Sequence, residues 1–359
     1  MNLLSGYCRD LERGTLAGWN RFWFSPTDPA TLGMIRLFAG AMLFYTHLVW
    51  SHDLNGFFGD QAWLTPATIN KLPGASPFQW SYFYWIHSPA LLWTAHIAAL
   101  IVFALLTVGL WSRTMSVLAF LATVSYAHRA SLTQFGLDDT NCMLAMYLMV
   151  GPCGAAYSVD RWLQHRRTGG AFAVAPSIGA NIAIRLLQVH LCVEYFFSGI
   201  GKAQGPLWWN GDAILMATAN LEYQSLGATW LIHYRALASM LTHITVFWEL
   251  TYCTLVWPRL TRPIVIAIGI GMHLGIGLFL GMWTFGLAMI IANLSFVSPW
   301  IVRRLLDRQS EPQDGADSQK SSDRQTSSGQ KRPERAGSSK PSSRSGQGAG
   351  NASLTAARL

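Results

Sequence analysis

Ionisable and hydroxyl side chains recur at steps of four along one apolar segment, residues 179–202. His190, Glu194, Ser198 and Lys202 occupy successive helical turns there. Steps of four keep side chains on one helix face, so these residues form a polar stripe about 18 Å long. Histidine, carboxylate and amine groups are the usual general acids and bases of proteins, so the stripe could bind a substrate and move a proton.

Structural roles compete with this chemical role. Lys202 could be an interfacial lysine whose amine reaches the membrane surface. His190 and Glu194 could form an internal hydrogen-bonded pair that holds helices together. The same pair has the spacing of two metal ligands, but no third ligand follows by spacing, and no metal is therefore expected.

Other charged or titratable residues also lie inside apolar segments, where a charge costs several kcal/mol. The ones expected to be structural intramembrane charges are Arg36, Arg185, Glu249 and His273. A buried carboxylate needs a cation, and Arg36 or Arg185 is the expected partner of Glu249. His273 lies among closely spaced glycines, which is typical of a hydrogen-bonded residue between packed helices.

The elements that must hold these residues are predicted to be membrane helices. The chain has 359 residues, 51% of them hydrophobic and 12% charged, about half the charge of a typical soluble protein. A membrane span needs roughly 20 apolar residues. Spans are predicted at 30–50, 89–111, 114–131, 139–157, 179–202, 232–257, 262–281 and 283–303. The expected fold is an all-α bundle of about eight transmembrane helices within a domain of residues 30–306.

Charge in the connections predicts the topology. Basic connections alternate with acidic or neutral ones, which places both termini in the cytoplasm. Two long outer connections, residues 52–88 and 205–231, are rich in aromatics and should rest on the outer interface. Residues 1–29 resemble an interfacial segment, and residues 307–359 have the composition of a disordered cytoplasmic tail.

Several classes of function are not indicated. The net charge of +8 is assigned to cytoplasmic connections, so a nucleic-acid partner is not expected. Neither a nucleotide-binding loop nor a Ser-His-Asp pattern occurs in the sequence. The five cysteines contain no CxxC and are interpreted as buried small hydrophobes. The one partner that the sequence indicates is the lipid bilayer.

One stretch carries a resemblance to a known family. The run Tyr195-Phe-Phe-Ser-Gly-Ile-Gly-Lys202, followed by Trp208-Trp209-Asn210-Gly211-Asp212, resembles the vitamin K-dependent γ-carboxylases. Arg36 early in the first span and Glu249 before a basic loop agree with this resemblance, as does Gly271-Met-His273-Leu-Gly275. The membrane part of those enzymes shares the HTTM (horizontally transferred transmembrane) domain with many bacterial proteins. The chain is identified as resembling this HTTM type over residues 20–306, which implies a bacterial inner-membrane protein.

The resemblance implies roles for individual residues. Lys202 matches the lysine that is understood to deprotonate vitamin K hydroquinone, so a reduced quinone is an implied cofactor and Lys202 an implied base. The residues expected to line the pocket are His190, Glu194, Ser198, Trp208, Asp212 and Asn141. Two features depart from the carboxylases. Their Asn-His motif is replaced by Asp138-Asp139-Thr140-Asn141, and their large β-rich lumenal domain has no counterpart in the tail composition.

A second hypothesis is not enzymatic. The chain could be a transporter or a membrane assembly partner, in which the intramembrane polar residues form a pathway. Internal symmetry between residues 30–157 and 179–303 would favour a transporter, but no convincing repeat is visible. An enclosed cavity that opens outward at Lys202 would favour the enzyme.

Overall fold

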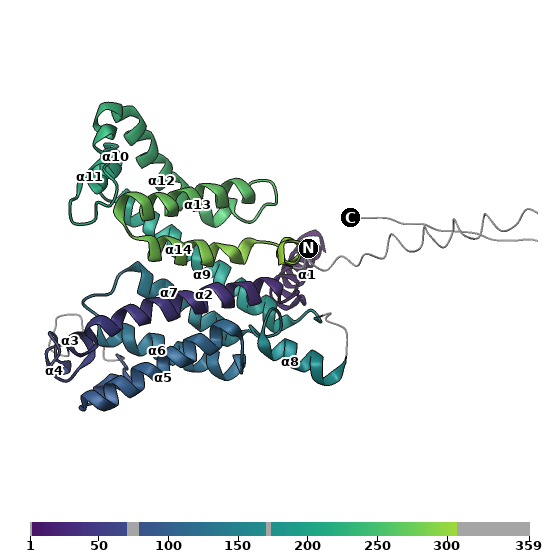
Figure 1. The fold of residues 1–359 in the computed structure, drawn as a ribbon. Helices are drawn as coiled ribbons and strands as arrows, with labels where there is room; N and C mark the ends of the chain where they lie inside the picture. The colour runs from purple at the N-terminus through teal and green to yellow at the C-terminus, as the bar shows by residue number, and fades with distance from the viewer. Residues whose placement is uncertain (1, 70–78, 170–173, 307–359) are drawn as a thin grey trace, which may run out of the picture. The chain divides into compact units, whose positions relative to one another are not determined.

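A computed structural model describes residues 2–69, 79–169 and 174–306 (Figure 1). Every regular element in these ranges is helical, and an isolated bridge between Thr27 and Ser177 is the β contact found among them. The all-α prediction is confirmed. The expected disordered tail, residues 307–359, lies outside the described residues.

Seven of the eight predicted spans each overlap one long helix. These helices are α2 (Ala30–Val49), α5 (Pro89–Val108), α6 (Ser112–Arg129), α7 (Gly136–Val150), α9 (Ile178–Ala203), α12 (Arg235–Leu255) and α13 (Arg262–Leu280). By length and composition, Ala30–Phe58, Pro89–Val108 and Arg262–Leu280 are apolar enough to cross a membrane. The described chain is therefore membrane-compatible, but composition alone supports fewer spans than the predicted eight.

The eighth predicted span, residues 283–303, is not one continuous helix. Helix α14 (Trp283–Asn293) passes through the short η4 (Leu294–Phe296) and is followed by α15 (Pro299–Leu306), and the two arms are bent by 112°. Pro299 explains the break, because proline disfavours helical backbone at the residue before it and then starts a new helix. If the bent pair is one span, the number supported by composition rises to four.

The long helices pack in neighbouring pairs (Figure 1). Helix α2 packs along α5, α6 along α7, α9 along α12, and α13 along α14. Helix α7 joins the two sets of pairs because it also contacts α9 and α14. One hydrophobic core cluster, which includes Leu43, Phe103, Leu144, Leu191 and Tyr252, runs through both sets.

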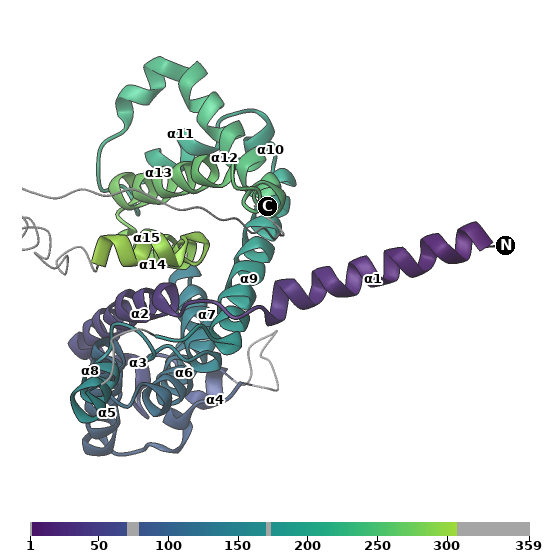
Figure 2. The same ribbon diagram turned by 90° about the vertical axis from the view of Figure 1, so that its right-hand side faces the viewer.

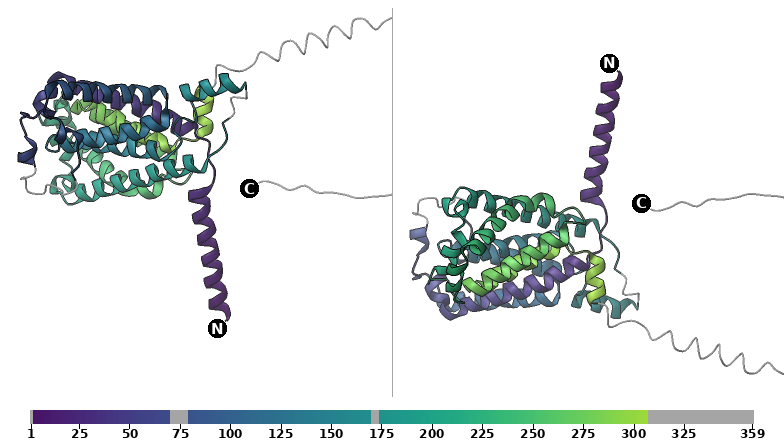
Figure 3. Two further views of the ribbon diagram at one scale, coloured as in Figure 1. Left: turned by 90° about the horizontal axis from the view of Figure 1, so that it is seen from below. Right: turned by 90° about the horizontal axis from the view of Figure 1, so that it is seen from above.

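The connections sort to opposite ends of the bundle (Figure 3). One end holds the two long aromatic connections, with η1 (Trp50–Asp53), α3 (Leu54–Phe58), α4 (Pro66–Ile69), η2 (Tyr82–Trp85), α10 (Pro206–Trp209), α11 (Ala213–Ala219) and η3 (Thr229–Tyr234). The other end holds α8 (Val159–Thr168), α15 and the start of α2. Helix α1 (Asn2–Phe24) leaves that second end and runs across the direction of the bundle helices (Figure 2).

An ion pair ties the start of α2 to α15. The Arg303 guanidinium donates to both carboxylate oxygens of Asp28, and the backbone N–H of Ala30 donates to Asp28 Oδ1 at 2.9 Å. Burial raises the pKa of Asp28, but these hydrogen bonds lower it by more, so the net pKa lies below 3.8. This ion pair holds α15, which follows the 112° bend, against the start of α2.

Arg36 joins three segments through backbone carbonyls. This fully buried side chain donates from Nη1 to Leu106 O at 2.7 Å and Thr107 O at 2.8 Å, from Nε to Cys153 O at 3.1 Å, and from Nη2 to Tyr157 O at 2.6 Å. Carbonyls in the last turn of a helix such as α5 lack intrahelical partners, so Arg36 supplies donors that water would otherwise provide. Arg36 therefore does not pair with Glu249, and that expectation was wrong.

We expect Arg36→Met to destabilise the protein by at least about 3 kcal/mol, because it strands four carbonyls in a buried place. Thermal unfolding of the full chain in detergent would measure this loss. Arg259→Met, at an exposed position, serves as the matched control. Equal melting temperatures for the two variants would contradict a structural role for Arg36.

Candidate functional site

The amine of Lys202 lies between a hydroxyl and a buried carboxylate. Lys202 Nζ donates to Ser198 Oγ at 2.6 Å and to Glu249 Oε1 at 2.9 Å, and Nζ is 2.8 Å from Glu249 Oε2. The cation that pairs with Glu249 is thus Lys202, and not Arg36 or Arg185 as expected. The sequence did not reveal this pair because it depends on which helices pack together, here α9 and α12.

Local sequence allows the close approach of these two helices. Ser198 lies one turn before Lys202 and so shares its face of α9. Gly199 faces α12, where an added Cβ would lie 3.1 Å from the Cβ of Glu249 and 3.1 Å from the side chain of Leu250. A glycine at this position lets the backbones approach until the lysine and glutamate meet.

The Lys202–Glu249 pair is largely buried, but part of the lysine reaches the surface. The side chain of Glu249 is 8% exposed and that of Lys202 is 24% exposed. The ring centroid of Trp208, from α10, lies 5.5 Å from Lys202 Nζ, within range of a cation–π contact. The amine is therefore reached from the end of the bundle that carries the two long aromatic connections, beside Trp208.

A chain of neutral hydrogen bonds lies deeper between the same helices. The Tyr195 hydroxyl is 2.7 Å from His273 Nε2, Asn293 Nδ2 donates to the Tyr195 oxygen at 2.9 Å, and Tyr252 donates to Asn293 Oδ1 at 2.8 Å. Because the Tyr195 oxygen accepts from Asn293, its O–H is free to donate to His273. The network joins α9, α12, α13 and α14. Sequence reasoning singled out neither Asn293 nor Tyr195 as a hydrogen-bonding residue.

His190 and Glu194 do not form the expected internal pair. His190 Nδ1 is 2.8 Å from the Tyr147 hydroxyl on α7, and Glu194 Oε2 is buried with no hydrogen-bond partner among the described residues. Helix geometry explains why the four residues of the stripe do not share one set of partners, because each step of four advances about 40° around a helix. Three steps from His190 to Lys202 turn the stripe by about 120°, so it begins against α7 and ends against α12.

The other expected pocket residues are dispersed. Asn141 donates to Thr46 Oγ1 at 3.5 Å on α2, and Asp212 pairs with Arg235 at 3.2 Å. Arg185 donates to Gln188 at 3.0 Å and stacks over Phe22 at 4.5 Å, near the end of the bundle that α1 leaves. The structure thus brings Lys202, Ser198, Glu249 and Trp208 together and places the remaining candidates elsewhere.

The cluster is suited to exchanging one proton. The two charged groups lie within hydrogen-bond distance, so a proton can pass directly between nitrogen and oxygen. Among the described residues no group of three His, Cys, Asp or Glu side chains could hold a metal ion.

Comparison with known proteins agrees with the fold. A family model of the HTTM domain matches residues 24–300, which is most of the chain. Neither the curated proteins nor the solved structures contain a match. The family match includes every helix from α2 to α14, together with Lys202, Glu249 and Trp208. The chain is a membrane protein that belongs to the HTTM domain family.

Proposed function

We propose that all eight predicted segments cross a bacterial inner membrane, with both termini in the cytoplasm. The sorting of connections supports this, because the aromatic outer connections share one end of the bundle and the basic helices α8 and α15 share the other. The direction of α1 fits a helix that lies on the cytoplasmic surface. Its exposed apolar residues include Leu11, Leu16 and Trp19.

We further propose that Lys202 and Glu249 act as an acid–base pair on a membrane-soluble, quinol-like substrate. The contact of the Lys202 amine with a buried carboxylate, beneath Trp208, is the observation that carries this proposal. In the ion pair the amine holds its proton. It becomes a base only when Glu249 accepts that proton across the 2.9 Å contact. The free amine then removes a proton from the quinol hydroxyl, which is the step implied by the resemblance to the carboxylases.

Trp208 fits this role because it can bind two kinds of group. An indole face attracts the Lys202 ammonium in the resting protein and can stack on an aromatic quinol ring. A substrate that displaces Trp208 from the amine would also keep water from the pair. Without water, the ammonium–carboxylate pair is less stable relative to the neutral amine and carboxylic acid. Exclusion of water therefore favours proton transfer from Lys202 to Glu249.

A transporter is the second candidate function. The buried Glu194 oxygen without a hydrogen-bond partner among the described residues favours it, because such a group can carry a proton or bind a passing cation. In that case Glu194 would be as important as Lys202. Substitution of the two residues therefore separates the hypotheses.

The first test is Lys202→Arg. A guanidinium keeps the charge and can still pair with Glu249, but it does not deprotonate, so it cannot serve as a base. We expect oxygen-dependent oxidation of a reduced naphthoquinone in proteoliposomes, followed by absorbance, to fall roughly 100-fold or more. Arg235→Lys alters the exposed Asp212 pair and is the matched control. Wild-type turnover retained by Lys202→Arg would exclude the base. Proton uptake into the proteoliposomes that is lost in Glu194→Gln but kept in Lys202→Arg would favour the transporter.

The second test is a double-mutant cycle on the ion pair. Glu249→Leu should destabilise the protein by about 2–3 kcal/mol because it leaves the Lys202 ammonium unpaired. The loss is less than for a fully buried pair, since the Lys202 side chain is 24% exposed and can turn outward. Adding Lys202→Met should restore most of the stability, as measured by unfolding in detergent. Additive losses would show that the two groups are not coupled.

The third test addresses topology. Thr168 ends α8, Ser225 lies in the connection that follows α11, and both residues are exposed. Helices α8 and α11 lie at opposite ends of the bundle (Figure 1). In a Cys8→Ser background, Ser225→Cys should react with a membrane-impermeant maleimide added to intact spheroplasts, whereas Thr168→Cys should react only after permeabilisation. Reaction of Thr168→Cys in intact spheroplasts would overturn the orientation.

A further inference from the structure

Arg129, at the end of α6, is buried to the same degree as Arg36 but is less completely bonded. Its side chain is 1% exposed. Nη1 donates to Leu64 O at 2.8 Å and Nη2 donates to Gly59 O at 2.9 Å, while Nε has no hydrogen-bond partner among the described residues. A guanidinium carries five N–H donors, so most of the donor capacity of Arg129 is unused.

The contrast with Arg36 is informative because both side chains lie inside one protein. Arg36 makes four hydrogen bonds and uses its Nε. Neither arginine makes an ion pair with a described carboxylate. The Asp60 carboxylate, whose charge acts on Arg129, instead contacts His87 at 3.2 Å. Four carbonyl oxygens compensate the Arg36 cation, whereas Arg129 has two and an unpartnered Nε. A buried cation that is incompletely bonded is costly, which indicates that an anion from outside the chain completes the Arg129 site.

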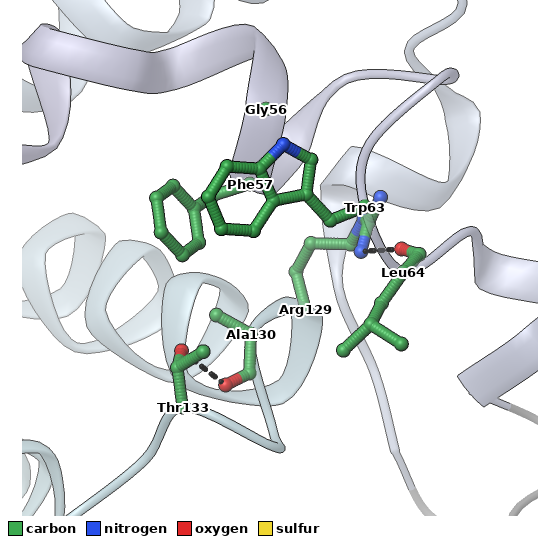
Figure 4. Close-up of a pocket in the computed structure, with 7 residues that line it drawn as sticks. All are labelled: Gly56, Phe57, Trp63, Leu64, Arg129, Ala130 and Thr133. Atoms are coloured by element: carbon green, nitrogen blue, oxygen red, sulfur yellow. Dashed lines mark hydrogen bonds between the residues drawn. The ribbon is translucent and has the colours of Figure 1, made fainter.

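A cavity lies beside Arg129, between α3, the segment at Trp63 and the end of α6 (Figure 4). It is lined by Gly56, Phe57, Trp63, Leu64, Arg129, Ala130 and Thr133, and its volume is about 40 Å³. That volume holds a few water molecules or one small oxyanion, but not a quinol ring. The Lys202 site is separate, because none of its residues lines this cavity.

Trp63 forms the outer wall of the cavity. It is 78% exposed and its ring lies 5.3 Å from that of Phe57, in a tilted contact (Figure 4). An exposed indole can swing aside at small cost because it gives up little buried area. Tryptophan at the end of a membrane bundle lies at headgroup level, where lipid phosphates are also found.

We propose that this cavity binds a phosphate group, supplied by a lipid headgroup of the outer leaflet or by free phosphate. The guanidinium of Arg129 offers donors in a fork that matches phosphate oxygens. The Thr133 hydroxyl, which donates to Ala130 O at 3.0 Å, can turn toward the same group. The bound anion compensates the buried charge and fixes the outer connection against the end of α6.

The test uses the full chain, delipidated in a neutral detergent. Melting temperature is measured with inorganic phosphate, with phosphatidylglycerol, and with sodium chloride at equal ionic strength. A rise of about 3 °C over chloride is expected near saturation. A rise with inorganic phosphate identifies a site for the free anion, and a rise with the lipid alone identifies a headgroup site. No rise with either probe would overturn the proposal.

Variants then locate the effect. Arg129→Met removes the cation, and Ala130→Leu fills the cavity while the cation stays, so both should abolish the rise. If Arg129→Met fails to fold, Ala130→Leu decides the question. Arg166→Gln, an exposed cation on α8 at the other end of the bundle, should keep the full rise. An undiminished rise in Ala130→Leu, or a loss in Arg166→Gln, would mean that phosphate acts elsewhere on the protein.

Discussion

The hydrogen bonds of Arg36 to backbone carbonyls are the constraint on which the first half of the bundle depends. The carbonyls of Leu106 and Cys153 lie in buried contacts away from water, so the protein must supply their donors itself. Arg36 reaches its acceptors because α2 approaches them closely. Added Cβ atoms would lie 2.6 Å from Ala156 O at Gly33 and 2.8 Å from Thr107 Oγ1 at Gly40. Glycines one turn before and after the arginine thus bring α2 against α5 and against the connection after α7.

The cost of burying polar groups also explains which polar contacts lie at which depth in the second half of the bundle. Where Lys202 and Glu249 meet, near the end of the bundle that carries the two long aromatic connections, a charged pair is tolerated because the lysine is partly exposed. Deeper between the same helices, the contacts of Tyr195, His273 and Asn293 are hydrogen bonds between groups that need no charge. A charge becomes costlier toward the bilayer centre, so this order follows from the solvent that surrounds the bundle.

Much of the fold could be predicted from the sequence, because length and hydropathy determine where membrane helices form. The same reasoning showed that Glu249 needs a cation but named the wrong one, since a one-dimensional pattern does not state which helices pack together. Arg36 was misassigned for a related reason: its acceptors are backbone carbonyls, which leave no sequence signal. The break before α15 did have a signal in Pro299, which an apolar-length criterion overlooks.

The path of the polar stripe along α9 bears on which function the bundle can perform. A transport pathway needs polar groups that face one continuous route. The stripe instead turns by about 120° between His190 and Lys202, because a step of four exceeds one helical turn. Its inner part meets Tyr147 on α7, and its outer part meets Glu249 on α12. Packed apolar residues of the core cluster, including Leu187 and Leu191, share α9 with the stripe. The His190–Tyr147 contact and the Lys202–Glu249 contact are therefore separate and involve different helices. This arrangement is better suited to local proton chemistry at Lys202 than to transport of an ion from one contact to the other.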